Sequence, residues 1–222
     1  MLSNLNLDTA TATHLLGTLD TAQLLAVAAA LGWASGLRLY AVVFLTGVAG
    51  YFGWVDLPNG LKVLQSPVML GASGLMLFVE FFADKIPGVD TLWDVIHTIV
   101  RIPAGAALAA AVFGADQSSW AMAAALMGGT LAATSHLAKA TTRVALNTSP
   151  EPFSNVAMSL LGDAAVPAAL WLSVVHPYVF YGALALVVVL SVALIWVLAR
   201  FLRALARRVS GWFGAERAPL LR

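Results

Sequence analysis

The sequence contains no cysteine, which excludes disulfides, zinc–thiolate sites, iron–sulfur clusters and thiol nucleophiles. Charge is also scarce, since 10% of the 222 residues are charged and a soluble domain carries roughly 25%. The net charge is +1, so the chain lacks the positive excess with which proteins bind nucleic acids. Apolar residues make up 60%, and the mean hydropathy is +0.87. These values exclude a soluble globular domain, a disordered tail and a coiled coil, and they predict a polytopic protein of the lipid bilayer.

Six apolar stretches follow a short polar leader at 1–20. The leader has no Lys or Arg and no long apolar run, so it fits neither a secretory signal nor a presequence. Asp20 and Gln23 have the spacing of a capping box, which predicts that the first membrane helix starts at residue 21. Crossing a hydrocarbon core of about 30 Å takes about 20 apolar residues. The sequence therefore predicts an all-α membrane protein with about six transmembrane helices. The apolar stretches are 22–54, 67–84, 93–115, 119–146, 154–175 and 178–199.

Arginines after the sixth stretch determine the predicted orientation. The tail at 200–222 is rich in arginine, so the positive-inside rule predicts a cytoplasmic C-terminus. Six crossings then place the N-terminus on the cytoplasmic side as well. Within the tail, 200–213 places four arginines on one helical face and Leu205, Val209 and Trp212 on another. This pattern predicts an amphipathic helix that lies at the membrane surface.

The first stretch is longer than one crossing requires. Residues 21–54 would form a straight helix of about 51 Å, and the small residues Ala34, Ser35 and Gly36 predict a break just before Arg38. The fourth stretch also carries a run of small residues, 128–135, followed by a basic segment. The sequence thus predicts a long or broken first helix at both places.

The same order of features occurs twice along the chain. Each half has a long first helix with a basic residue, a proline-bearing loop, a second helix with an acid and a third apolar helix. Three crossings is an odd number, so two such halves enter the membrane from opposite sides. The halves 21–116 and 117–199 are therefore predicted to be inverted repeats, a common architecture of transporters. The alternative is that helices rich in Ala, Gly and Ser resemble one another by composition alone.

Several ionisable residues fall inside the apolar stretches, where each costs about 2.5–3.5 kcal/mol and so requires a partner or a function. We expect Arg38 to face Asp163, and Lys139 or Arg143 to face Glu80, between the two halves. These charges either form salt bridges that fix helix packing or bind a polar solute or ion, and both interpretations stay open. The candidate substrate- or ion-binding residues are Arg38, Glu80, Asp84, His136, Lys139, Arg143 and Asp163.

The segment 80–97 is the densest in charge. Asp90, Asp94 and His97 lie in it beside a Pro-Gly turn, and carboxylates with an imidazole are ligands for divalent cations such as Mg²⁺, Mn²⁺ or Ca²⁺. The alternative is that the two aspartates are ordinary acids in the first turns of a helix, with Lys85 and Arg101 neutralising the rest. No cofactor other than this cation is predicted.

Three stretches resemble a known family. FVEFFADKIPGVDTLWDVIHTIVRIPAGA at 78–106 and HLAKATTRVALNTSPEPFSN at 136–155 are similar to two signature stretches of the bacterial membrane family called domain of unknown function 4126. GLRLYAVVFLTGVAGYFGW at 36–54 resembles its first helix. The resemblance covers about 22–175 and implies a bacterial inner-membrane protein, but it implies no activity. Where the family pattern often has an acid, this chain has Gly162 beside Asp163.

Enzyme motifs are incomplete in this sequence. The run 71–74 matches the nucleophile motif of rhomboid proteases and 161–163 resembles that of intramembrane aspartyl proteases, but the rest of either pattern is absent. We therefore expect no enzyme. We expect a transporter or channel for a small polar solute or ion, and a homodimer because 222 residues is small for a transporter. The alternative is a non-transporting scaffold or lipid-handling protein whose buried charges are packing salt bridges.

Overall fold

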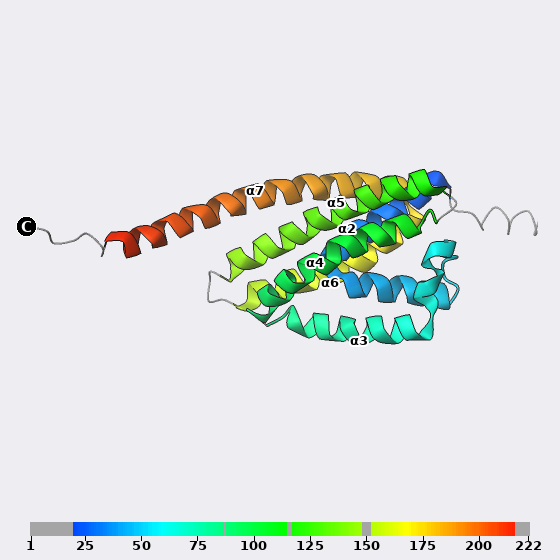
Figure 1. Cartoon of the computed structure of the whole chain (residues 1–222), viewed down its shortest axis with the longest axis horizontal. Helices are drawn as coiled ribbons and strands as arrows, with labels where there is room; N and C mark the ends of the chain where they lie inside the picture. The colour runs from blue at the N-terminus through cyan, green and yellow to red at the C-terminus, as the bar shows by residue number, and fades with distance from the viewer. Residues whose placement is uncertain (1–19, 87, 115–116, 148–151, 216–222) are drawn as a thin grey trace, which may run out of the picture.

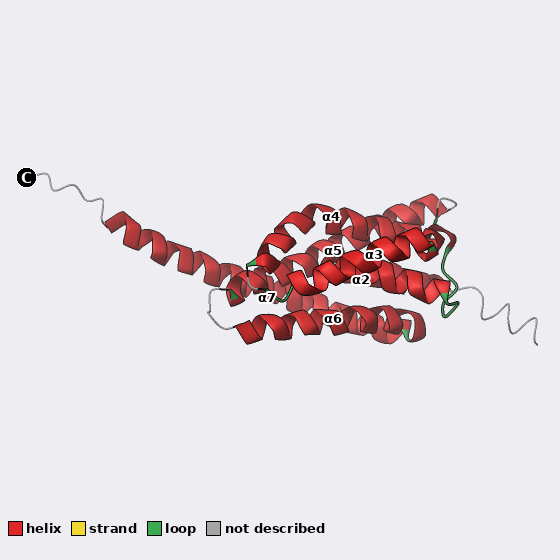
Figure 2. Cartoon of the chain, turned by 90° about the horizontal axis from the view of Figure 1, so that it is seen from below, coloured by secondary structure: helices red, strands yellow, loops and turns green. Residues whose placement is uncertain are grey.

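The computed structural model describes residues 20–86, 88–114, 117–147 and 152–215, and the elements in these ranges are helices (Figure 2). The predicted all-α class is therefore confirmed. Within these ranges, five helices are long and apolar enough to cross a membrane, or six if the bent pair of η1 and α3, at 70° to each other, is one span. The elements are α2 (Thr21–Tyr51), the 3-10 helix η1 (Asn59–Gln65), α3 (Pro67–Ala83), α4 (Val89–Ala111), α5 (Ser118–Leu146), α6 (Pro152–Val175) and α7 (Pro177–Ala215).

The helix α2 is broken in the middle. It begins with the predicted capping box, in which Asp20 accepts from the Gln23 N–H and the Gln23 side chain accepts from the Asp20 N–H. The backbone leaves the helical conformation at Arg38, with φ −149° and ψ 84°. The predicted break is therefore confirmed, directly after the small residues that indicate it.

The two arms of α2, 21–37 and 39–51, fold back on each other. Val27 and Ala49 line the same cavity, although a straight helix would separate them by about 33 Å. Figure 1 shows the dark-blue first arm starting at the right, and the light-blue second arm returning to the right. The helix is thus a hairpin whose tip is at Arg38.

The hairpin places the beginning and the end of the described chain at opposite ends of the bundle (Figure 1). We call them the η1 end, which holds Thr21, η1 and the α6–α7 turn, and the α3–α4 end, which holds the turn between those helices. The helix α7 starts at the η1 end and extends past the α3–α4 end. The hairpin differs from a straight crossing over 22–54, and it places the start of α2 and the end of α7 at opposite ends of the bundle. The cytoplasmic position of both termini stays a prediction. The leader at 1–19 lies outside the described residues.

The first arm of α2 is the centre of the bundle. All residues from Ala26 to Gly36 are buried. Gly32 contacts Gly128 of α5 so closely that a Cβ on Gly32 would collide with the Gly128 backbone, and a Cβ on Gly105 of α4 would lie 2.7 Å from the Ala132 Cβ. Ser135 Oγ donates to the Trp33 carbonyl at 2.6 Å. Small residues therefore bring α2, α4 and α5 into backbone contact, as they do in other membrane bundles.

The second half of the chain differs from the first. Helix α5 is long, as predicted, but it is one continuous helix of 29 residues. Helix α7 runs on through 200–213 without a separate surface helix, and the side chains beyond residue 207 lie outside the described set. The turn between α4 and α5 falls at the predicted boundary of the halves. The inverted repeat remains a prediction.

Candidate functional site

A network of ion pairs occupies the bundle toward its α3–α4 end. It joins the tip of α2 to α3, α4, α5 and α6, and it balances five positive with five negative side chains, so its formal charge is zero. Eight of these ten belong to the predicted substrate or metal site, and Lys85 and Arg101 were predicted only as neutralising charges. The members are Arg38, Lys85, Arg101, Lys139 and Arg143 with Glu80, Asp84, Asp90, Asp94 and Asp163.

Asp84 is the hub of the network. It follows the last residue of α3, and one of its oxygens, Oδ2, lies 2.9 Å from Arg38 Nη1 and 2.9 Å from Lys139 Nζ. Arg143 Nη2 is 3.2 Å from the same oxygen, and Arg143 also donates to the Asp84 carbonyl at 3.1 Å. Three cations from two helices therefore converge on one fully buried carboxylate.

Arg38 links this hub to α6. Its Nε lies 2.6 Å from Asp163 Oδ1, so the predicted pairing of these two residues is confirmed. Its Nη2 donates to the Ser159 hydroxyl at 2.8 Å. On the other side of Asp163, Lys85 Nζ is 3.2 Å from Oδ2. Lys85 and Asp163 are 19% and 22% exposed, whereas Arg38 is 1% exposed, so this pair forms the rim of the network.

The partner of Glu80 differs from the one predicted. Glu80 Oε1 pairs with Arg101 Nη2 at 2.7 Å, and Lys139 and Arg143 contact Asp84 and Asp94 instead. Arg101 also holds Asp94 at 2.6 Å. Arg101 lies about 16 Å along α4 from Asp90, farther from the α3–α4 turn than the other ionisable residues of this helix. The signal that identifies it is spacing, since Asp90, Asp94, His97, Arg101 and Gly105 form the buried stripe of α4.

His136 contacts two side chains of α4. Thr98 uses its hydroxyl hydrogen on the Asp94 carbonyl, so at 2.7 Å it accepts from His136 Nε2–H. Arg101 Nη1 donates to His136 Nδ1 at 3.3 Å, and a nitrogen that accepts carries no proton. His136 therefore links α5 to α4 through Thr98 and Arg101.

His97 lies beside the network and is also held by protein groups. Its Nδ1 donates to the Trp93 carbonyl at 2.8 Å, and the Tyr40 hydroxyl lies 3.3 Å from Nε2. The ring stacks on Trp93, with 4.0 Å between centroids. Tyr40 was not among the predicted residues, and its contact joins the second arm of α2 to α4.

The three predicted metal ligands do not converge. Asp90 lies in the first turn of α4, where its Oδ1 accepts from the N–H groups of Gly88 and Thr91, and its Oδ2 lies 3.3 Å from Arg143. Asp94 is held by arginine and lysine, and His97 by Trp93 and Tyr40. Across the described residues, no group of three or more His, Asp or Glu side chains is placed to hold a metal ion. The divalent-cation interpretation of Asp90, Asp94 and His97 thus finds no support in this geometry.

Gly162 faces the network. A Cβ at this position would lie 3.9 Å from Arg38 Nε. An acid, which the resemblance implies at this position, would therefore add a second carboxylate beside Arg38. Here Asp163 alone on α6 pairs with that guanidinium.

The polar network ends at the middle of the bundle. Beyond Arg101, toward the η1 end, the buried face of α4 continues with Gly105 and Ala109, which pack against Gly32 and Gly128. The network is therefore a polar column from the α3–α4 end to a close contact of small residues. Within it, Glu80 Oε2, Asp84 Oδ1 and Arg101 Nε are buried without a hydrogen-bond partner. These atoms give the column unused capacity to bind a polar ligand.

A family model, Domain of unknown function (DUF4126), matches residues 25–200. No curated protein and no solved structure matches the chain. The match covers α2 through the membrane part of α7 and includes all ten residues of the network.

Proposed function

Because the chain belongs to the family described as domain of unknown function 4126, whose description states no activity, we propose its function from the geometry of the site. The chain is a multi-pass helical membrane protein. We propose that it is a transporter or channel for a small polar solute or ion, and that the ion-pair network is its binding site.

The break at Arg38 is the observation that carries this proposal. Secondary transporters bind their substrates where a membrane helix is interrupted, because the interruption exposes helix ends and free backbone groups inside the protein. Here the first arm of α2 ends beside a cation, since Lys139 Nζ donates to the Leu37 carbonyl at 3.0 Å. The second arm begins directly after Arg38. Backbone groups and charged side chains of opposite sign thus meet at one point inside the bundle.

Exchange of ion-pair partners would open the site. Asp84 Oδ2 already shares three cations, and each of them has a second carboxylate: Arg38 has Asp163, and Lys139 and Arg143 have Asp94. A solute that replaces one carboxylate therefore leaves no cation without a partner. The solute would enter at the rim pair of Lys85 and Asp163. The contact of Gly32 with Gly128 closes the half of the bundle toward the η1 end.

We propose that the α3–α4 end faces the cytoplasm of a bacterium. Lys85 and the arginines of α7 from Arg200 onward lie at this end, whereas Lys62 is the cation that the described residues place at the η1 end. The positive-inside rule then assigns the η1 end to the outside of the inner membrane. A homodimer remains an expectation from the small size of the chain.

A second function has one observation in its favour. The network has equal numbers of cations and carboxylates and most of them are buried, which is the arrangement expected if the pairs only hold the helices together. The protein would then be a scaffold or a lipid-handling protein without transport.

Flux measurements on Glu80→Gln separate the two functions. This variant removes a charge whose partner, Arg101, keeps Asp94, so the bundle retains a paired arginine. The purified chain in liposomes is tested with a panel of small cations and anions, and its melting temperature is measured in detergent. If the protein transports, one solute moves faster than in protein-free liposomes, and Glu80→Gln lowers that flux at least about ten-fold, as loss of one binding interaction implies.

Lys62→Gln is the matched control, because Lys62 is exposed at the opposite end of the bundle. It should leave both flux and melting temperature unchanged. If no solute in the panel moves and Glu80→Gln lowers only the melting temperature, the transport proposal fails and the scaffold is favoured. Equal flux and stability in wild type and Glu80→Gln would show that the site is assigned to the wrong residues.

A further inference from the structure

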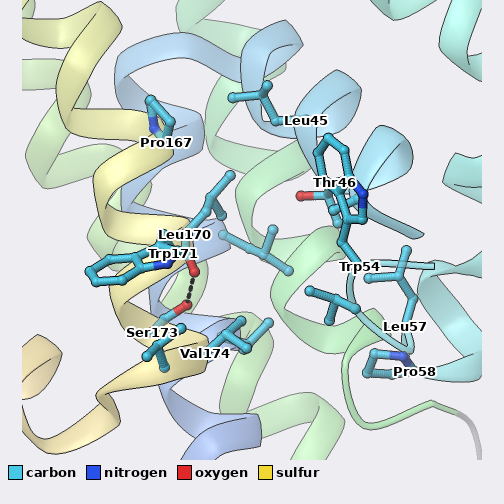
Figure 3. A pocket seen from close by; sticks show the side chains of 15 residues that line it. Leu45, Thr46, Trp54, Leu57, Pro58, Pro167, Leu170, Trp171, Ser173 and Val174 are labelled. Atoms are coloured by element: carbon cyan, nitrogen blue, oxygen red, sulfur yellow. Dashed lines mark hydrogen bonds between the residues drawn. The ribbon is translucent and has the colours of Figure 1, made fainter. Parts of the chain in front are cut away.

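A cavity of about 430 Å³ lies away from the ion pairs, between the two arms of α2 and the second half of α6. Figure 3 shows Leu45 and Thr46 of the second arm facing Leu170 and Val174 of α6 across it. Its volume is within the range of about 300–1,000 Å³ that ligand sites have. Its walls are almost entirely apolar, which excludes the small polar solute of the proposed function as its ligand.

Two hydroxyl side chains, Ser173 and Thr46, line these walls, and Ser173 Oγ donates to the Leu170 carbonyl at 2.8 Å, whereas Thr46 makes no such bond. The Thr46 side-chain oxygen is buried without a hydrogen-bond partner, and the residue is 8% exposed. Hydroxyls in membrane helices usually donate to a carbonyl one turn earlier, and Ser35, Ser73, Thr98 and Thr142 do so here. Thr46 makes no such bond, and in Figure 3 its hydroxyl points into the cavity. A buried hydroxyl without a partner is costly, so a ligand with an acceptor or donor at this point would stabilise it.

The position of the cavity indicates which ligand is available. It opens in the membrane-spanning bundle near the η1 end, where its wall includes Trp54 and Trp171, 71% and 61% exposed. Exposed tryptophans of membrane proteins lie at the level of the lipid headgroups. A bilayer molecule at this level therefore presents to the opening an apolar chain with an oxygen-bearing group next to it.

We propose that this cavity binds the acyl chain of a membrane phospholipid, and that Thr46 Oγ1 donates to the ester carbonyl of that lipid. The lipid fills the space between the arms of α2 and holds them apart. This site is independent of the proposed transport function, because it shares no residue with the ion-pair network.

Photo-crosslinking tests the proposal on the full chain. The protein is reconstituted in vesicles of phosphatidylethanolamine and phosphatidylglycerol that contain a phospholipid with a diazirine in its acyl chain, and the cross-linked residues are mapped by mass spectrometry. Leu31 lines the cavity and is 0% exposed, so a label reaches it only through the cavity. Leu190 of α7, 57% exposed, reports ordinary contact with surrounding lipid. We expect cross-links at both residues.

Two variants identify the site. Ala49→Trp places a large side chain in the cavity and should abolish the cross-link at Leu31 while leaving the one at Leu190. Thr46→Val keeps the shape and removes the hydroxyl, so it should lower the Leu31 yield roughly three- to ten-fold, as loss of one hydrogen bond implies. It also provides the test if Ala49→Trp does not fold.

The proposal is overturned if the cross-link yield at Leu31 with the diazirine phospholipid does not exceed the yield with a free diazirine reagent. It is also overturned if Ala49→Trp leaves the labelling of Leu31 unchanged. If Ala49→Trp removes the label and Thr46→Val does not change it, the acyl chain binds but the bond to Thr46 is wrong. None of these outcomes depends on flux, so the site and the transport function are tested separately.

Discussion

At the scale of single residues, the buried arginines are tolerated because each pairs with at least two carboxylates. An unpaired ionised side chain inside a membrane protein is costly, and a pair offsets this cost only when further hydrogen bonds complete it. Arg38 contacts Asp84, Asp163 and Ser159, and Arg101 contacts Glu80, Asp94 and His136. The guanidinium group suits this role because its donors point in several fixed directions.

Asp84 should be the carboxylate that the fold can least lose. Asp84→Asn leaves three buried cations around a neutral group, so we expect it to lower the free energy of unfolding by about 3–5 kcal/mol, the range for breaking a buried pair. Asp163→Asn should cost less, because Asp163 is partly exposed. The measurement is thermal unfolding in detergent, with Asp56→Asn, an exposed residue at the η1 end, as control.

A second substitution tests whether the charge is the cause. Adding Lys139→Met to Asp84→Asn restores the balance of charges and should recover part of the loss. If the double variant is no more stable than Asp84→Asn, the loss arises from the shape of the α3–α4 turn and the hub assignment is wrong.

Most members of the network could be predicted from the sequence because ionisable residues are rare in apolar stretches. Their partners could not, apart from the pair of Arg38 and Asp163. Glu80 and Asp84 are four residues apart and share a helix face, yet Glu80 pairs with Arg101 whereas Asp84 pairs with Arg38, Lys139 and Arg143. The two carboxylates lie about 6 Å apart along α3, so they meet different neighbours, and sequence spacing does not show which helices pack beside each of them.

At the scale of the helices, the boundaries were predicted closely and the path of α2 was not. The stretch predicted at 119–146 is a helix at Ser118–Leu146, and the one at 154–175 is a helix at Pro152–Val175. Small residues before Arg38 indicate a break, but they do not encode its angle. The angle depends on where both arms find packing partners, and α4, α5 and α6 supply these only in the folded bundle.

The contact between α2 and α5 should be sensitive to a single methyl group. Gly32→Ala would drive a Cβ into the Gly128 backbone, and a helix backbone moves less readily than a side chain. We expect a loss of about 1–3 kcal/mol, as in other overpacked cores. Gly71→Ala on α3 is the matched control, because no atom lies within 4 Å of its added Cβ. In unfolding experiments in detergent, Gly32→Ala should be less stable than the wild type, and Gly71→Ala should be at least as stable as the wild type. Equal stabilities of the two variants would contradict the close contact between Gly32 and Gly128.

At the scale of the whole molecule, the hairpin in α2 changes the number of times the chain crosses the bundle. With a straight α2, residue 20 and the arginines of α7 would lie on the same side. With the hairpin they lie on opposite sides, while the loop between α2 and η1 lies on the same side as the start of α2 (Figure 1). The distribution of charge agrees with the hairpin, because no Lys or Arg precedes Arg38 and arginines are dense after Arg200.

The absence of cysteine makes this arrangement directly testable, because single cysteines can be introduced without background. We expect a membrane-impermeant maleimide applied to intact cells to label Asp20→Cys and Asp56→Cys, and to label Arg203→Cys only after permeabilisation. All three positions are exposed. If Asp20→Cys and Arg203→Cys are both labelled only after permeabilisation, α2 crosses straight and the hairpin is wrong. If the pattern is inverted as a whole, with Arg203→Cys alone labelled in intact cells, the hairpin holds and the assignment of the α3–α4 end to the cytoplasm is wrong.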